Sequence, residues 1–408
     1  MAAGAVEPLY RPEAFEPLSP TLWSEGRVRD AIAEIVADAD DTFDGDRLWP
    51  ADEWDGWSTA LPLKNLYVGA IGVIWALWAL RERGVAESRL ELEEAAGRTL
   101  ELRRERPDLM TGIELPQPAD ASLLEGESGI LAVLTLCWNN TNMFGDELLA
   151  LVRANAANPA LGLMWGAPGT MLAAKALFEA TGEPRWAEAW RESADALLAR
   201  RDAEGLWVQQ LYGERSRQLG PVHGAVGNVR VLLDGGSLLD DETRDTLARE
   251  TGALLERTAV RARGLANWPA AAFEPLLGGD GQIRLQWDVG APGIVATATD
   301  YLEEELLIAG AELVWQAGAH GSEKGSGICH GTAGNGYALL SAFGRTGDEC
   351  WLEQARQFAV HALEQARRAR DLRGRGRYSL WTGDVGVALY AADCLEGRPR
   401  YPILAGWS

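Results

Sequence analysis

Short apolar segments alternate along the chain with longer, charged segments. Each apolar segment follows two glycines three residues apart, and its side chains are apolar on nearly every face, which predicts a buried helix. The seven glycine pairs are Gly69/Gly72, Gly126/Gly129, Gly166/Gly169, Gly224/Gly227, Gly290/Gly293, Gly331/Gly334 and Gly383/Gly386. The charged segments, such as residues 183–200 and 348–369, carry apolar residues at a spacing near 3.6, which predicts amphipathic helices of an outer layer.

The recurrence of this pattern predicts a repeat protein in which each repeat supplies one inner and one outer helix. Seven such helix hairpins fit an open solenoid or a closed ring. We favour an all-α fold, an α/α toroid with inner and outer helix rings, because neither end carries a polar capping repeat. The glycines are then explained by backbones that crowd together where the inner helices begin. We expect one domain, with residues 1–60 as an N-terminal segment packed on a toroid of residues 61–408.

Composition narrows the possible partners of this protein. The 408 residues include 38 Lys and Arg against 60 Asp and Glu, a net charge of −22, which argues against binding nucleic acid or an anionic membrane. The four cysteines are too few and too scattered for a disulfide framework. The first residues do not form a signal peptide, and no apolar stretch is long enough to span a membrane. We therefore expect a monomeric protein of the cytoplasm.

The residues just before each first glycine occupy equivalent positions around the predicted ring. In the fourth, fifth and sixth repeats they include His223, Asp288 and the adjacent pair Cys329 and His330. A thiolate, an imidazole and a carboxylate from neighbouring helix starts are typical of a zinc site, and catalytic zinc has three protein ligands and one open position. The alternative is that Cys329 is a small buried side chain, His330 a polar residue at a helix start and Asp288 a helix cap.

Other residues near the glycine pairs are candidates for substrate binding. Arg284 lies four residues before Asp288 and is predicted to point toward the same mouth, although a surface position is equally compatible with the pattern. Trp165, Trp287 and Trp381 flank glycine pairs and are predicted to line the central cavity. Two further features are open to two interpretations each. Asp384, inside the last pair, is either a substrate contact or a favourable charge at a helix start. The six arginines of residues 367–377 are either a site for an acidic peptide or a solvated loop.

The sequence around these glycine pairs resembles the lanthionine synthetase C-like family. The segments that carry the resemblance are LMWGAPGTMLAAKAL, LGPVHGAVGNV, IRLQWDVGAPGIV, GSGICHGTAGNGYALL and GRYSLWTGDVGVALY, and it extends from about residue 60 to about residue 400. The resemblance implies a toroid of seven inner and seven outer helices. It also implies one zinc ion, held by two cysteines and a histidine, that activates a thiol for addition to dehydroalanine or dehydrobutyrine. The product is a thioether, in a peptide or as a glutathione adduct.

The resemblance assigns roles to individual residues. It implies that Cys329 and His330 are zinc ligands, His223 a catalytic histidine and Arg284 a catalytic arginine. Two positions depart from the family pattern. Asp288 stands where the family has its first cysteine ligand, which predicts a harder and more weakly bound metal site. Gly162 stands where the family usually has an acidic residue, so the acid or base of that position is missing.

Three hypotheses about function follow. In the first, Asp288, Cys329 and His330 hold zinc, a substrate thiolate attacks the dehydroamino acid, Arg284 stabilises the enolate and His223 protonates the α-carbon. The substrate would be a dehydrated peptide, prepared by a separate dehydratase, or a small thiol. In the second, the protein has lost the chemistry and serves as a peptide-binding scaffold. In the third, it is a carbohydrate-active toroid in which Asp288 and Asp384 are the paired carboxylates.

Overall fold

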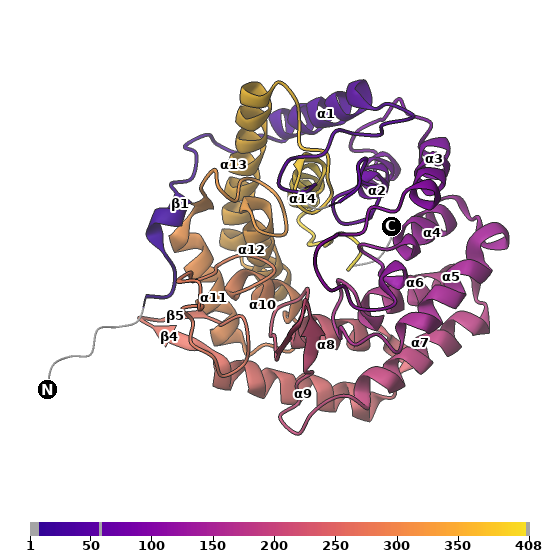
Figure 1. Cartoon of the computed structure of the whole chain (residues 1–408). Coiled ribbons are helices and arrows are strands. Elements are labelled where there is room, and N and C mark those ends of the chain that lie inside the picture. Colours follow the sequence, from indigo (N-terminus) through magenta and orange to yellow (C-terminus); the bar gives the residue numbers. More distant parts are fainter. Residues whose placement is uncertain (1–7, 57–58, 405–408) are drawn as a thin grey trace, which may run out of the picture.

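Two concentric rings of helices form the molecule (Figure 1), and the computed structural model describes residues 8–56 and 59–404 of the chain. The inner ring is made of α2 (Ala70–Glu82), α4 (Glu127–Trp138), α6 (Ala167–Thr181), α8 (Ala225–Asp234), α10 (Ala291–Thr297), α12 (Thr332–Thr346) and α14 (Asp384–Glu396). The outer ring is made of α3 (Leu92–Glu105), α5 (Thr141–Asn155), α7 (Pro184–Leu198), α9 (Asp241–Thr258), α11 (Glu304–Ala317), α13 (Glu349–Arg373) and α1 (Glu25–Thr42). The predicted all-α toroid is confirmed.

The first helix of the chain completes the outer ring beside the last one. Helix α1 packs against α14 and α13, so the N-terminal segment supplies the outer helix of the seventh repeat (Figure 1). Its buried side chains, among them Val28, Ile32 and Ile35, recur every three to four residues, as an amphipathic helix requires. The two ends of the chain are therefore joined by packing within one repeat.

The glycine pairs mark the start of every inner helix. The first glycine of each pair is the residue that precedes the helix, and the second lies in its first turn. A Cβ atom on Gly129 would lie 2.1 Å from the carbonyl oxygen of Leu123, and one on Gly334 would lie 1.8 Å from that of Ile328. Only glycine permits this approach of the backbone, and this explains why the pattern recurs in the sequence.

A belt of backbone hydrogen bonds links the repeats just above the inner helices. In five of the repeats, the residue two positions before the first glycine donates its N–H to the carbonyl oxygen of the equivalent residue in the next repeat. These bonds run from Tyr67 to Leu124 (3.0 Å), Met164 to Val222 (3.3 Å), Asp288 to Cys329 (3.2 Å), Cys329 to Trp381 (2.8 Å) and Trp381 to Tyr67 (3.2 Å). The last bond joins the seventh repeat to the first and closes the ring.

Short strands and 3-10 turns fill the connections. β1 (Phe15–Glu16) pairs antiparallel with β6 (Ala319–His320), and two hairpins are formed by β2 (Gln209–Leu211) with β3 (Glu214–Ser216) and by β4 (Val260–Ala262) with β5 (Leu265–Asn267). The 3-10 turns are Pro12–Ala14, Ala119–Ala121 and Gly236–Leu238. None of the described helices has the length and apolar character needed to cross a membrane.

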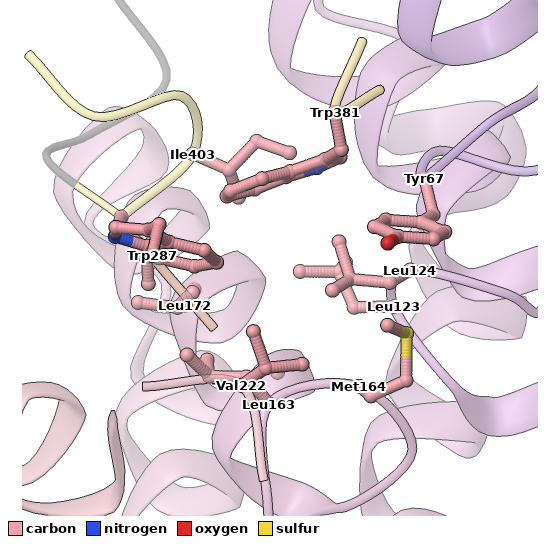
Figure 2. A pocket seen from close by; sticks show the side chains of 12 residues that line it. Tyr67, Leu123, Leu124, Leu163, Met164, Leu172, Val222, Trp287, Trp381 and Ile403 are labelled. Atoms are coloured by element: carbon pink, nitrogen blue, oxygen red, sulfur yellow. The ribbon is translucent and has the colours of Figure 1, made fainter. Parts of the chain in front are cut away.

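The end of the chain fills the middle of the ring. The Tyr401 ring stacks on Trp287, with ring centroids 5.4 Å apart. Ile403 and Leu404 then lie among the apolar side chains that line the pocket on the axis, and Figure 2 shows Ile403 beside Trp381. The bore of the toroid is therefore filled with apolar side chains below the belt.

Candidate metal centre

Asp288, Cys329 and His330 come together at the mouth. The Cys329 Sγ lies 3.6 Å from His330 Nε2, which in turn lies 3.4 Å from Asp288 Oδ2. One ligand atom from each residue lies within 4.8 Å of the other two. The belt explains this convergence, because Asp288 of the fifth repeat and Cys329 of the sixth are joined by their backbones.

The donor set fits a zinc ion. Thiolate, imidazole and carboxylate are all zinc ligands, and three of them leave a fourth position for substrate. The Gln286 amide donates a hydrogen bond of 2.7 Å to Asp288 Oδ1, and this leaves Oδ2 on the side of His330. Such outer contacts orient ligands in metal sites. The residues present are therefore compatible with the metal that the sequence predicts.

The charges at this centre are strongly coupled. Burial alone would raise the pKa of Asp288, but the neighbouring His330 and the hydrogen bond from Gln286 hold it below its usual value. Burial would likewise lower the pKa of His330, but the charges of Cys329 and Asp288 hold it well above its usual value. The site thus favours an anionic Asp288 beside a positively charged His330. A bound cation would supply that positive charge in place of the histidine proton.

His223 lies beside this cluster, as the sequence predicts. Burial lowers the pKa of its imidazole to about 4, and the charges of Asp288 and His330 are the next contributions. The ring is therefore neutral at pH 7 and can accept a proton there. The repeat order explains its place, because His223 belongs to the fourth repeat, next to the one that carries Asp288.

Arg284 takes a different position. Its guanidinium pairs with Asp280 at 2.6 Å, and the side chain is 37% exposed. Within the described part of the chain, its side-chain hydrogen bonds go to Asp280 alone. The structure therefore brings His223, but not Arg284, to the three candidate ligands.

The three tryptophans predicted to line the cavity are buried. Trp287 and Trp381 face each other across the bore with ring centroids 4.8 Å apart, and Figure 2 shows both above the leucines of the apolar core. Trp165 donates its indole N–H to the Tyr212 hydroxyl at 2.8 Å and packs behind the mouth. Trp287 and Trp381 thus form the floor beneath the centre, and Trp165 supports its wall.

A large groove opens next to His330. It has a volume of about 920 Å³ and lies between the N-terminal segment, residues 322–331 and the end of α13. Asp384 lies at its edge and accepts the backbone N–H of Arg377, while burial raises the pKa of its carboxyl group to about 7. The groove therefore offers a route to His330 with room for a peptide or a small thiol.

The arginine-rich residues 367–377 hold the chain's own acidic segment. The first seven of these residues belong to α13 and are not the solvated loop that the sequence allowed. The ion pairs are Arg368 with Glu16, Arg370 with Glu34, Arg373 with Asp52 and Arg377 with Asp55, at distances from 2.5 to 3.3 Å. The arginines thus tie the N-terminal segment to the mouth of the toroid.

This tie places Trp54 against the metal centre. The Trp54 ring meets the His330 ring edge-on at 5.3 Å, and the guanidinium of Arg377 lies 5.6 Å from the Trp54 ring centre. Asp55 accepts hydrogen bonds from Arg377 and from the Thr382 hydroxyl. We call residues 52–55 the strap. Sequence patterns do not predict the strap, because the segment has no motif and its partners lie more than 270 residues away along the chain.

Gly162 has no room for a side chain. A Cβ atom there would lie 2.9 Å from Gln209 Nε2 and 2.9 Å from the α-carbon of His223. Gln209, from β2, is buried, and neither atom of its amide has a hydrogen-bond partner in the described structure. The departure from the family pattern at this position is therefore built into the packing around His223.

Comparison with known proteins agrees with these features. The family model described as "Lanthionine synthetase C-like protein" matches residues 56–403. Glutathione S-transferase LANCL1 of Danio rerio is 26% identical over 209 residues, 48% of this chain and 46% of that protein. LanC-like protein GCL1 of Arabidopsis thaliana is 28% identical over 159 residues, 37% of this chain and 34% of that protein. The matched parts thus span less than half the length of these relatives.

A solved structure shares the fold over nearly the whole chain. Nisin cyclase superposes with a TM-score of 0.63 over 93% of this chain and 98% of that one, at 14% sequence identity. At this identity the likeness concerns the fold, and any role of the mouth must be argued from its own residues.

Proposed function

Because the chain belongs to the lanthionine synthetase C-like family, we propose that it is a zinc-dependent enzyme that adds a thiol to dehydroalanine or dehydrobutyrine. The observation that carries this proposal is the convergence of Asp288, Cys329 and His330 within 4.8 Å. Zinc, when bound, would hold the substrate thiol and lower its pKa, so that the thiolate is available at neutral pH.

The protein's own residues would supply the remaining steps. Asp288, Cys329 and His330 hold the ion, with Gln286 orienting the carboxylate. Burial lowers the pKa of His223 to about 4, so at pH 7 the ring is neutral, carries no proton for the donor role that the sequence suggested, and is a weak acceptor for the thiol proton. Arg284 would reach the enolate only by leaving Asp280, so its catalytic role stays a prediction.

The groove beside His330 suits a substrate that carries both positive and negative charges. Lys324 and Arg368 line it together with Glu16 and Glu364, and its volume of about 920 Å³ exceeds that of a single amino acid. A relative named as a glutathione S-transferase supports a small peptide thiol as the nucleophile. A dehydrated peptide, supplied by a separate dehydratase, is the proposed acceptor.

The two departures from the family pattern favour a second candidate. With Asp288 in place of a cysteine and no side chain possible at Gly162, the toroid would bind peptides without joining them. The carbohydrate-active alternative is disfavoured by the family match, and it gives Cys329 and His330 no role.

The test combines metal content with thiol addition. Purified protein is loaded with zinc, dialysed and analysed for metal, then incubated with glutathione and a dehydroalanine-containing peptide. Bound zinc near one equivalent, with a thioether product that requires it, is the expected result. Bound peptide without product would favour the scaffold, and absence of both would contradict the proposal.

A further inference from the structure

A buried carboxyl group lies across the mouth from the candidate ligands. Glu125 is the residue just before the first glycine of the second repeat, the position that His223 has in the fourth repeat and His330 in the sixth. Its side chain is 6% exposed. The repeat symmetry therefore places Glu125 on the same rim as two residues of the site. The second repeat is separated from the sixth by the first and the seventh.

The surroundings of Glu125 favour its neutral form. The Asn65 amide nitrogen donates to Glu125 Oε2 at 3.0 Å and also lies 3.4 Å from Asp108 Oδ2. The nearby Arg103 is bonded to Asp108 and Asp120 instead. Within the described residues, no lysine or arginine is bonded to Glu125.

The remaining neighbours are acids and phenols. Burial, then the charge of Asp108, raises the pKa of Glu125 to about 8, with the charge of Arg103 lowering it and that of Asp55 raising it. Tyr67 and Tyr212 face it from the first repeat and from the β2–β3 hairpin, and its charge raises the pKa of both phenols after burial. At neutral pH the carboxyl group therefore carries a proton that it can give up.

Tyr67 connects this carboxyl group to the metal centre. Its backbone N–H is bonded to the carbonyl oxygen of Leu124, directly before Glu125. Burial raises the pKa of its phenol most, and the charges of Cys329, on one side, and of Glu125 raise it further, so Tyr67 lies within reach of both groups. A substrate held at Cys329 and extended across the mouth would thus have Glu125 on its far side.

We propose that Glu125 is the proton donor of the reaction, a role that rests on the proposed function. The thiolate sulfur forms a bond to the β-carbon of the dehydroamino acid, and the double-bond electrons move to the α-carbon and its carbonyl group. Glu125 gives its proton to the α-carbon and becomes a carboxylate. The thiol proton, released earlier to His223 or to solvent, restores the acid, so the net reaction adds one S–H across one double bond.

The test compares Glu125→Gln with the matched variant Glu127→Gln. Glu127 lies two residues further on, as the first residue of α4, and pairs with Arg104. Glutathione and a dehydroalanine peptide are the substrates, and zinc content and circular dichroism confirm that each variant is folded and loaded. We expect Glu125→Gln to lower kcat by roughly 100-fold with little change in KM, and to give both α-carbon configurations because water supplies the proton. Glu127→Gln should behave as the wild type.

The pH profile provides a second readout. The wild-type rate should fall as pH rises above about 8, where Glu125 ionises, and Glu125→Gln should lose this fall. Glu125→Asp, which keeps an acid, should retain it with part of the activity, and it serves if the glutamine variant does not fold. Unchanged kcat, pH profile and product configuration in both variants would overturn the role of Glu125 alone. A wild-type protein that forms no thioether would instead remove the proposed function.

Discussion

The backbone N–H of Asp288 donates a hydrogen bond of 3.2 Å to the carbonyl oxygen of Cys329. This bond belongs to the belt that joins neighbouring repeats, so it sets the spacing between two side chains from different helix hairpins. The same geometry joins Tyr67 of the first repeat to Leu124 of the second, and neither of these residues is a candidate ligand. The fold therefore provides seven equivalent rim positions, and the residue types at two neighbouring ones, Asp288 in the fifth repeat and Cys329 with the adjacent His330 in the sixth, decide where a metal can bind.

Replacing Asp288 by alanine should remove most of the bound zinc. Two donors would remain, and a mutation of even an outer contact typically costs roughly 10–100-fold in affinity, so the loss of a ligand should cost more. Asp288→Cys should instead bind zinc more tightly, because thiolate is the softer donor. Competition with a chromogenic chelator measures both. The exposed Asp371→Asn serves as control, and equal affinity of all four proteins would exclude Asp288 as a ligand.

Gln286→Ala should weaken zinc binding without removing it. The Gln286 amide holds Asp288 Oδ1, and its loss lets the carboxylate turn away from His330. We expect a decrease of roughly 10–100-fold in affinity, the usual effect of an outer contact. Gln282→Ala, an exposed glutamine on the same segment, should leave affinity unchanged. Equal affinities of the two variants would show that Asp288 does not depend on Gln286.

The repeats and the ligands could be predicted from the sequence because both depend on local constraints. A glycine is required wherever a Cβ atom would meet a carbonyl oxygen, as at Gly334, so the motif recurs at each helix start. Equivalent repeat positions then placed Cys329 near Asp288 and His223 without any knowledge of distances. The resemblance to a known family agreed with the toroid that the repeats predict, and it identified Asp288 as a departure from the cysteine of the family pattern.

Other parts of the site could not be predicted, because they depend on contacts distant in the sequence. Trp54 reaches His330 only through the pairing of Asp55 with Arg377. Arg284 has a local partner, Asp280, that its position in the motif does not reveal. Glu125 shares the rim position of His223, and this is a signal in the sequence. Its burial and its bond to Asn65, however, cannot be predicted from that position.

Gly162→Asp should destabilise the protein rather than restore an acid. The new Cβ would lie 2.9 Å from the α-carbon of His223, which is backbone and cannot turn aside as the Gln209 side chain can. Overpacking of this kind costs about 1–3 kcal/mol. Thermal unfolding should show a lower midpoint, and adding Gln209→Ala should not restore it. Gly279→Asp, where a Cβ meets nothing within 4 Å, is the control. A stable Gly162→Asp protein would contradict the packing argument.

Stability should decrease between pH 4 and 8 because of buried carboxyl groups. Burial raises the pKa of Glu125 to about 8 and that of Asp384 to about 7, so the folded state binds more protons than the unfolded state in this range. Below pH 4 these carboxyl groups are protonated in both the folded and the unfolded state, so they do not lower the free energy of unfolding. Above pH 8 they are ionised in both states, and the loss of stability has reached its full size. Glu125→Gln and Asp384→Asn should each gain stability relative to the wild type as pH rises, on the order of 1–3 kcal/mol.

Urea unfolding at several pH values measures this difference. Asp371→Asn, at an exposed position of α13, should follow the wild-type curve at every pH. A stability difference that stays constant with pH would show that the two carboxyl groups are not protonated in the folded protein.

Trp54→Ala should make the metal centre more accessible. The ring is 56% exposed and covers the His330 edge at 5.3 Å, so its loss opens one side of the centre while removing little buried surface. We expect the global stability to change by less than about 1 kcal/mol, as is usual for an exposed side chain with one cation–π contact. Zinc loaded into the variant should be removed by a chelator several-fold faster than from the wild type.

The control for this prediction is Met143→Ala, another exposed apolar side chain on the outer helix α5. Asp55→Asn provides an independent variant, because it weakens the ion pair with Arg377 that holds the strap but keeps the Trp54 side chain itself. If the strap limits access, both strap variants should release zinc faster, and the stronger effect should come from the loss of the ring itself. Release rates equal to that of Met143→Ala would mean that ligands reach the centre through the groove without any movement of the strap.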